Sequence, residues 1–257
     1  MVTQPGENVA VCAVRGNFDD AQTGVKRIFA DDGREGWAAK SGVCLSSANS
    51  INLGRLAPQV AYYFKSYMDL VRRGGIAMGE EVNFVVPTGN FGDILAGDFA
   101  RRMGLPVAKL ICASNANNVL TAFIRTGLYD RRRAFHKTAS PSMDILVSSN
   151  LERYLYLESG RDAALVARLM RELTEKGAYT APEGVRKALS ERFWAGCADD
   201  TDTFRTIARV CTSWAICSTP TPPSPGRSTS ASASRTTTAK RPSSSPQPRP
   251  TSSPPAC

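Results

Sequence analysis

Short apolar runs alternate with amphipathic stretches between residues 81 and 147, and this alternation most constrains how the chain can fold. "EVNFVVP" (81–87) and "VAKLICAS" (107–114) have the composition of strands. "GDILAGDFARRMG" (92–104) lies between them and is typical of a helix that ends at a glycine. Strand and helix at this spacing predict an α/β fold, a parallel sheet covered by helices. Ligands of such sheets bind beyond the carboxyl ends of the strands.

The same patterns predict further elements on both sides of this core. A long helix over 54–73 should break near Pro58, because proline cannot donate the backbone hydrogen bond of a helix interior. The other expected elements are strands at 8–14, 42–49 and 143–147 and helices at 19–31, 117–127 and over most of 160–210. Residues 1–210 therefore form one predicted domain.

The composition changes abruptly after Val210. Residues 218–257 consist almost entirely of Ser, Thr, Pro, Ala and Arg, and they hold ten of the sixteen prolines. Such a segment cannot bury enough apolar surface to fold, so the sequence predicts a low-complexity, disordered C-terminal tail over 211–257. Its proline-rich stretches leave open a scaffold function in which the tail binds SH3-like modules.

Charge and cysteine content argue against nucleic-acid binding and against a metal site. Five of the nine net positive charges lie in 211–257, so residues 1–210 are only mildly basic and nucleic-acid binding is not expected. The seven cysteines include no CxxC pair and there is a single histidine, which does not favour a metal site. With no apolar run of membrane-spanning length and no leader, we expect a cytoplasmic protein with reduced thiols.

The stretch "VVPTGNFGDI" (85–94) places a small-residue turn between a predicted strand and a predicted helix. Gly89 and Gly92 let backbone amides approach a ligand closely, and the helix N-terminus adds a positive dipole end. Together these features suit a phosphate group. The turn matches neither a Walker loop nor a dinucleotide fingerprint, so an ordinary tight turn with Asp93 as a cap stays open.

Four longer segments, taken together, closely resemble threonine synthase of the branch shared by bacteria and fungi. The resemblance spans roughly residues 1–210 and rests on "SSANSINLGRLAPQ" (46–59), "VPTGNFGDILAGDFARRMGLP" (86–106), "SNANNVLTAFIRTGLYD" (114–130) and "TASPSMDILVSSNLER" (138–153). It implies an incomplete domain of the tryptophan-synthase-β-like fold type II, which uses pyridoxal 5'-phosphate. The implied reaction converts O-phospho-L-homoserine and water to L-threonine and phosphate.

The resemblance also implies roles for individual residues. Gly89, Asn90 and Phe91 would hold the phosphate of the cofactor through backbone amides, and Asp93 would contribute its side chain. Four residues would bind the substrate phosphate, as hydroxyls, amides and a guanidinium suit that dianion: Ser47, Asn49, Asn52 and Arg55. A solvated helix residue is the alternative for Arg55, and no metal ligand is implied.

The fourth motif is interpreted mainly as structural. Ser140, Ser142 and Asp144 are expected to order a turn, and Asn150 to cap a helix. Asn118 receives no catalytic role. A chain that binds a phosphorylated metabolite without turning it over remains a second possible function.

The Schiff-base lysine of the family is expected to be absent from this chain. None of Lys26, Lys40, Lys65, Lys109 and Lys137 lies in the corresponding motif, and Met1 resembles an internal methionine. We therefore expect a fragment with little or no activity alone, which should show no borohydride-fixable adduct at a unique lysine.

The tail is interpreted as an out-of-frame translation. A permitted coding of "AICSTPTPPSP" (215–225), shifted by one base, can be read as "GYLLDPHTAVA", and the same shift of "SSSPQPRPTSSP" (243–254) permits "VVVATASPDKFP". Both shifted segments are similar to what threonine synthases carry next. A one-base frame change near Val210 is the resulting hypothesis.

Overall fold

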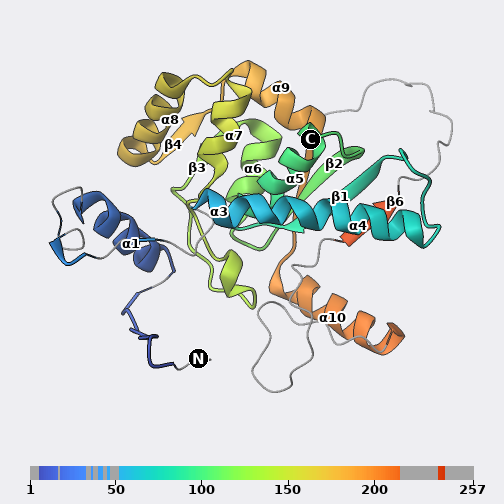
Figure 1. Cartoon of the computed structure of the whole chain (residues 1–257), viewed down its shortest axis with the longest axis horizontal. Helices are drawn as coiled ribbons and strands as arrows, with labels where there is room; N and C mark the ends of the chain where they lie inside the picture. Colours follow the sequence, from blue (N-terminus) through green and yellow to red (C-terminus); the bar gives the residue numbers. More distant parts are fainter. Residues whose placement is uncertain are drawn as a thin grey trace, which may run out of the picture.

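A four-stranded sheet lies at the centre of the computed structural model (Figure 1). The strand order is β5-β2-β1-β6, with β1 (Val82–Pro87), β2 (Val107–Ser114) and β5 (Phe193–Cys197) parallel and β6 (Thr237–Lys240) antiparallel to β1. The predicted parallel sheet is thus confirmed. The structure describes residues 6–16, 18–32, 36, 40–42, 45–46, 52–214 and 237–240.

Helices connect and cover these strands. α5 (Gly92–Arg102) links β1 to β2, and α6 (Val119–Thr126) follows β2. The predicted break at Pro58 is confirmed by the succession α3 (Leu53–Leu56), η1 (Ala57–Gln59) and α4 (Val60–Arg72). The remaining helical elements are α1 (Phe18–Asp32), η2 (Pro141–Met143), α7 (Leu151–Glu158), α8 (Ala163–Lys176), α9 (Glu183–Arg192) and α10 (Asp200–Trp214). Within the described residues, none of the helices combines the length and the apolar character needed to cross a membrane.

The core forms where α4 and α5 pack against the sheet. The rings of Tyr63 and Phe84 meet edge to face with centroids 4.9 Å apart. Gly97 makes this close approach possible, because a Cβ there would lie 2.7 Å from the Tyr63 ring and 2.9 Å from Leu110. Phe84 and Leu110 alternate with less buried strand residues, as the two-residue period of a strand requires.

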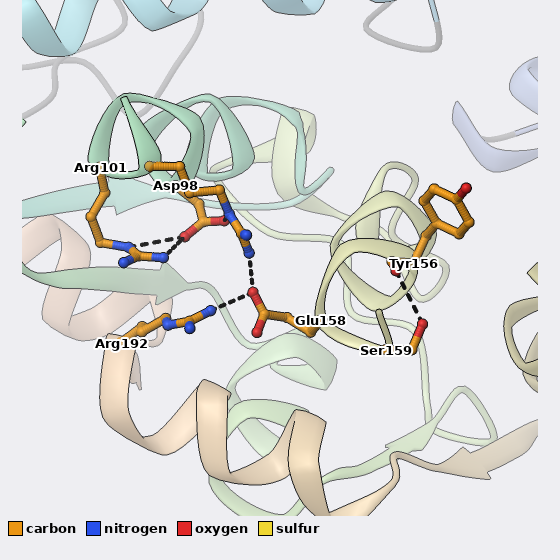
Figure 2. Close-up of polar contacts among 7 residues, drawn as sticks. Asp98, Arg101, Tyr156, Glu158, Ser159 and Arg192 are labelled. Carbon is orange, nitrogen blue, oxygen red and sulfur yellow. Dashed lines mark hydrogen bonds and ion pairs between the residues drawn. The ribbon is translucent and has the colours of Figure 1, made fainter. Parts of the chain in front are cut away.

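An ion-pair cluster joins the carboxyl-terminal ends of α5, α7 and α9. Asp98, whose side chain is fully buried, accepts from Arg101 at 2.8 Å and Arg102 at 2.6 Å. Glu158 of α7 pairs with both Arg102 and Arg192, and its carboxylate points toward Arg192 (Figure 2). Guanidinium groups are also favoured at the negative ends of helix dipoles. The cluster thereby fixes α5, whose other end carries the glycine-rich turn.

Two predicted strands are wrong, and four observed strands, β3 to β6, were not predicted. Residues 10–14 form no strand, Val9 makes only an isolated bridge to Gly6, and Val11 and Val14 are exposed. Residues 143–147 form the end of η2 and an irregular segment, since their backbone follows the turn that Asp144 organises. The sequence did not predict β5 or the antiparallel pair β3 (Leu128–Asp130) and β4 (Ala178–Thr180). Of the strand expected at 42–49, most residues lie outside the described ones.

The structure describes two short parts of the predicted tail, residues 211–214 and 237–240. α10 continues to Trp214, past the boundary at Val210, because its helical pattern is not interrupted there. Residues 237–240 form β6 instead of lacking regular structure. The physical reason is that β1 would otherwise present an unpaired edge, and β6 supplies backbone partners from Val82↔Lys240 to Val85↔Thr237. In Figure 1, α10 and α1 stand outside the body formed by the sheet and its covering helices.

Candidate active site

The glycine-rich turn lies at the edge of the sheet where the parallel strands end. β1 ends at Pro87 and β2 at Ser114, so the turn 88–92 and the segment 115–118 meet at this edge. The amide of Thr88 donates to the carbonyl of Ala113 at 2.8 Å, which ties the turn to β2. This is the edge at which α/β sheets bind their ligands.

The serine pair Ser148–Ser149, which precedes α7, holds the turn in place. The hydroxyl of Ser148 donates to the carbonyl of Gly89 at 2.8 Å. The amide of Ser149 donates to Oδ1 of Asn90 at 3.1 Å, and its hydroxyl donates to the same oxygen at 2.9 Å. The amide of Phe91 donates to the carbonyl of Ser149 at 2.9 Å. The predicted phosphate-binding amide of Phe91 is therefore already used within the protein.

Other amides of the turn have no such partner. No described group accepts a hydrogen bond from the backbone N–H of Gly89, Asn90, Gly92, Asp93 or Ile94. Gly92, Asp93 and Ile94 lie in the first turn of α5, whose backbone N–H groups have no carbonyl acceptor within the helix. The helix dipole is positive at this end. Phe91, the N-cap residue, supplies no side-chain cap. The turn therefore offers several donors to an anion.

Space around Gly89 is filled by the neighbouring turn. A Cβ at Gly89 would lie 2.9 Å from Cα of Met143 and 3.2 Å from the carbonyl oxygen of Ser142. Only glycine fits this approach of two backbones. The phenyl ring of Phe91 packs with Tyr154 and Phe193 at centroid distances of 5.8 Å each, which turns the side chain into the core. Phe91 therefore shapes the turn by packing.

Asp93 lies on the first turn of α5 and contacts α4. The hydroxyl of Tyr63 donates to the carbonyl of Asp93 at 2.8 Å and to its Oδ1 at 3.2 Å. Burial raises the pKa of the Asp93 carboxyl, and the hydrogen bond from Tyr63 opposes part of that rise. Burial and the nearby carboxylate also raise the pKa of Tyr63, which therefore stays a hydrogen-bond donor. A carboxyl group that gains a proton readily repels a bound anion less.

Asp144 organises the turn that packs on Gly89. Its Oδ1 accepts from Asn115 at 2.7 Å, from Asn117 at 3.0 Å and from the hydroxyl of Thr138 at 2.7 Å. Its Oδ2 accepts from the amide of Thr138 at 2.9 Å. Asn115 and Asn117 of segment 114–130 thus hold Asp144, and the turn that Asp144 orders packs on Gly89. The expectation that Asp144 orders a turn is confirmed.

The residues predicted to bind the substrate phosphate are only partly described. Ser47 and Asn49 lie outside the described residues. Asn52 caps α3 by accepting from the amide of Gly54 at 2.9 Å, and Arg55 is exposed within that short helix. The structure therefore brings Gly89, Asn90 and Asp93 together in one turn and leaves the substrate assignment as a prediction.

Sequence reasoning missed the serine pair and gave Asn150 a different role. Asn150 adopts a left-handed conformation with φ 72° and makes no side-chain cap. Its Oδ1 is buried without a hydrogen-bond partner among the described residues. The only local signal for this segment was the run of short polar side chains in "VSSN". Among the described residues, no group of three or more His, Cys, Asp or Glu could hold a metal ion.

Comparison with known proteins gives a consistent result. No family model matches the chain. It is 47% identical over 191 residues to human "Threonine synthase-like 1", covering 74% of this chain and 26% of that protein. It is 39% identical over 219 residues to the threonine synthase of Saccharomyces cerevisiae, covering 82% of this chain and 41% of that enzyme.

Solved structures agree with the sequence matches. The pyridoxal-phosphate-bound threonine synthase from Brucella melitensis superposes with a TM-score of 0.69 at 42% identity, over 80% of this chain and 42% of that one. The yeast threonine synthase gives a TM-score of 0.68 at 37% identity, over 81% and 41%. The chain therefore spans about two-fifths of the length of these synthases. Identity at this level together with a shared fold makes the chain threonine-synthase-like.

Proposed function

We propose that this chain carries the cofactor-phosphate site of a threonine synthase, the enzyme that converts O-phospho-L-homoserine and water to L-threonine and phosphate. The similarity to synthases of bacteria and yeast supports the proposal. The observation that carries it is the set of amides at Gly89, Asn90, Gly92, Asp93 and Ile94, which have no acceptor among the described residues. They lie at the sheet edge where such a cofactor would bind.

The residues present fit a phosphate group. A phosphate monoester accepts several hydrogen bonds and carries close to two negative charges, which matches converging amides at a helix N-terminus. The serine pair fixes Gly89 and Asn90 before any ligand arrives, so binding would cost little ordering of the turn. Phe91 contributes through its ring, since its amide is used by Ser149.

When bound, pyridoxal 5'-phosphate supplies an electron sink that stabilises carbanions next to the substrate amino group. This chain's own residues would position that group. The amides from Gly89 to Ile94, other than that of Phe91, would fix its phosphate. Asp93 would approach the phosphate with a carboxyl whose pKa is raised by burial, and Tyr63 would hold that carboxyl in orientation.

The segment 46–59 would recognise the substrate. Ser47, Asn49, Asn52 and Arg55 would bind the phosphate of O-phosphohomoserine. The guanidinium of Arg55 is suited to this group because it is permanently charged and can form paired hydrogen bonds. We also place the protein in the cytoplasm, where free thiols such as Cys112 and Cys197 persist.

Substrate binding provides the test. Unfolding temperature would be measured with O-phospho-L-homoserine and with L-homoserine, each in the presence of pyridoxal 5'-phosphate. We expect stabilisation by the phosphorylated compound alone, reduced in Arg55→Gln and retained in the control Arg205→Gln on α10, which is exposed and far along the chain. Equal responses to both compounds would contradict the substrate assignment, and no response to either would contradict the function.

A further inference from the structure

A second cavity, separate from the glycine-rich turn, is lined by residues of α1, of the segment 131–132 and of the end of α8. Its volume is about 630 Å³, and none of residues 88–94 lines it. Four cationic side chains and one carboxylate face it: Lys26, Arg131, Arg132 and Lys176 with Glu175. The cavity is therefore rich in positive charge.

Among the described residues, only Arg132 of these four cations forms an ion pair. Arg132 forms two hydrogen bonds of 2.9 Å with Asp130, and the pKa of that carboxyl is lowered to about 2 by its hydrogen bonds to Arg132. Arg131 donates to the carbonyl of Thr174 at 3.1 Å. Within the part of the chain that the structure describes, neither Lys26 nor Lys176 forms an ion pair.

Gln22 points independently to an acceptor ligand. It lies on α1, lines the cavity and is only 8% exposed. Its Nε2 is buried without any hydrogen-bond acceptor among the described residues. A buried donor without an acceptor costs free energy, and such groups are rare in folded proteins. When the side chain turns toward the cavity, a bound anion satisfies this donor.

An adjoining cavity of about 240 Å³ shares Lys26 and Val147 with the first. Apolar side chains of Leu151, Met170 and Leu173 line it together with Tyr179. The rings of Tyr129 and Tyr179 stack there with centroids 5.2 Å apart and planes 2° from parallel. These walls suit an aromatic or apolar group next to the cationic space.

We propose that the two cavities form one binding site for a small molecule with a phosphate group on an aromatic or apolar body. Lys26 and Lys176 bind the phosphate, and Gln22 donates a hydrogen bond to it. The body of the ligand lies against Leu173 and Tyr179. Ser148 and Ser149, which hold the turn at Gly89 and Asn90, line the second cavity from the other side.

Phenyl phosphate is a probe for this site, titrated into the full chain by calorimetry at constant ionic strength. We expect it to bind more tightly than inorganic phosphate, because the ring enters the second cavity. In the double variant Lys26→Gln/Lys176→Gln, affinity should fall about tenfold or more, since both ammonium groups are lost. Both lysines are exposed, so the variant should fold normally.

Two further variants make the outcome decisive. Lys187→Gln on α9 is the matched control, because Lys187 is exposed and lines neither cavity, and its affinity should equal that of the wild type. Gln22→Met keeps the side-chain shape but removes the donor and should weaken binding severalfold without lowering stability. Unchanged affinity in the double variant would overturn the proposal. Binding that depends instead on the turn at 88–94 would support the cofactor site alone.

Discussion

Two segments of this molecule that are both predicted to handle phosphate are held in different ways. The turn 88–92 is almost wholly buried and is bound by Ser148 and Ser149, which lie 59 residues away from their partners in sequence. The segment 52–55 is exposed, and the amide of Gly54 donates to Oδ1 of Asn52, only two residues away. Contacts between distant parts of the chain preorganise the buried turn, whereas an exposed segment leaves more of its order for a ligand to complete.

Glycine substitution should give the largest difference in the free energy of unfolding between the two segments. Gly89→Ala places a methyl group 2.9 Å from the backbone of Met143 and should lower the free energy of unfolding by about 2–3 kcal/mol. Gly54→Ala, in α3, meets only Oδ1 of Asn52 at 3.2 Å and should change stability by less than about 1 kcal/mol. Urea denaturation of both variants provides the measurement. Equal effects would mean that the turn at Gly89 is not closely packed.

Asparagine substitution should give a smaller difference in the free energy of unfolding between the two segments. Asn90→Ala leaves the amide and hydroxyl of Ser149 without their acceptor inside the protein and should cost about 1–3 kcal/mol. Asn52→Ala removes an exposed N-cap and should cost about 1 kcal/mol or less. Unfolding midpoints at one pH compare the two. A larger loss of stability in Asn52→Ala than in Asn90→Ala would contradict the view that the turn at Asn90 is the more firmly held segment.

Asp93 should give the buried turn a pH dependence of its own. Because burial raises its pKa in the folded state, the folded protein binds the proton more tightly, and stability from this group falls as pH rises through that pKa. Asp93→Asn removes the charge and keeps an acceptor for Tyr63, so it should be more stable than the wild type at pH 7 and about equal in acid.

A partly exposed aspartate, Asp69, provides the control for this titration. The pKa of Asp69 is lowered by its hydrogen bond to Lys65, so its contribution is present above the ordinary pKa and is lost in acid. Asp69→Asn should therefore be slightly less stable than the wild type at pH 7. Chemical denaturation from about pH 3 to 7 follows both variants. A neutral-pH loss of stability in Asp93→Asn would contradict the sign argued here.

Thiol reactivity should give the smallest effect and reports only on burial. Cys112 on β2 is buried beside the turn, and burial raises its pKa to about 11. Cys197 at the end of β5 is exposed. Reaction with a thiol reagent at pH 8, followed by peptide mapping, should modify Cys197 well before Cys112 in the folded protein. Equally rapid modification would show that this edge of the sheet opens readily.

The predictable parts of the fold are those with a local signal. β1, α5 and β2 were predicted because their apolar periods and closing glycine are continuous in sequence. β3, β4 and β5 were missed because strands of three to five residues carry almost no period. Residues 8–14 have the composition of a strand but join no sheet in the described structure, where Val9 makes only an isolated bridge to Gly6. Strand pairing depends on the tertiary fold.

The same distinction applies to the site. Gly89, Asn90 and Asp93 could be selected because a glycine-rich turn before a helix has a known chemical use. The contribution of Ser148 and Ser149 could not, since it depends on contacts made across the fold. The use of the Phe91 amide by Ser149 follows from the same contacts.

The measurement that tests the central claim most directly is a comparison of pyridoxal 5'-phosphate with pyridoxal, titrated calorimetrically into the full chain carrying Lys26→Gln/Lys176→Gln. That background removes the cationic cavity as a competing phosphate site. If the turn from Gly89 to Ile94 holds the cofactor phosphate, the phosphorylated compound binds saturably with one site per chain and pyridoxal binds at least about a hundredfold more weakly. Equal binding of the two compounds, or no binding of either, would contradict the account.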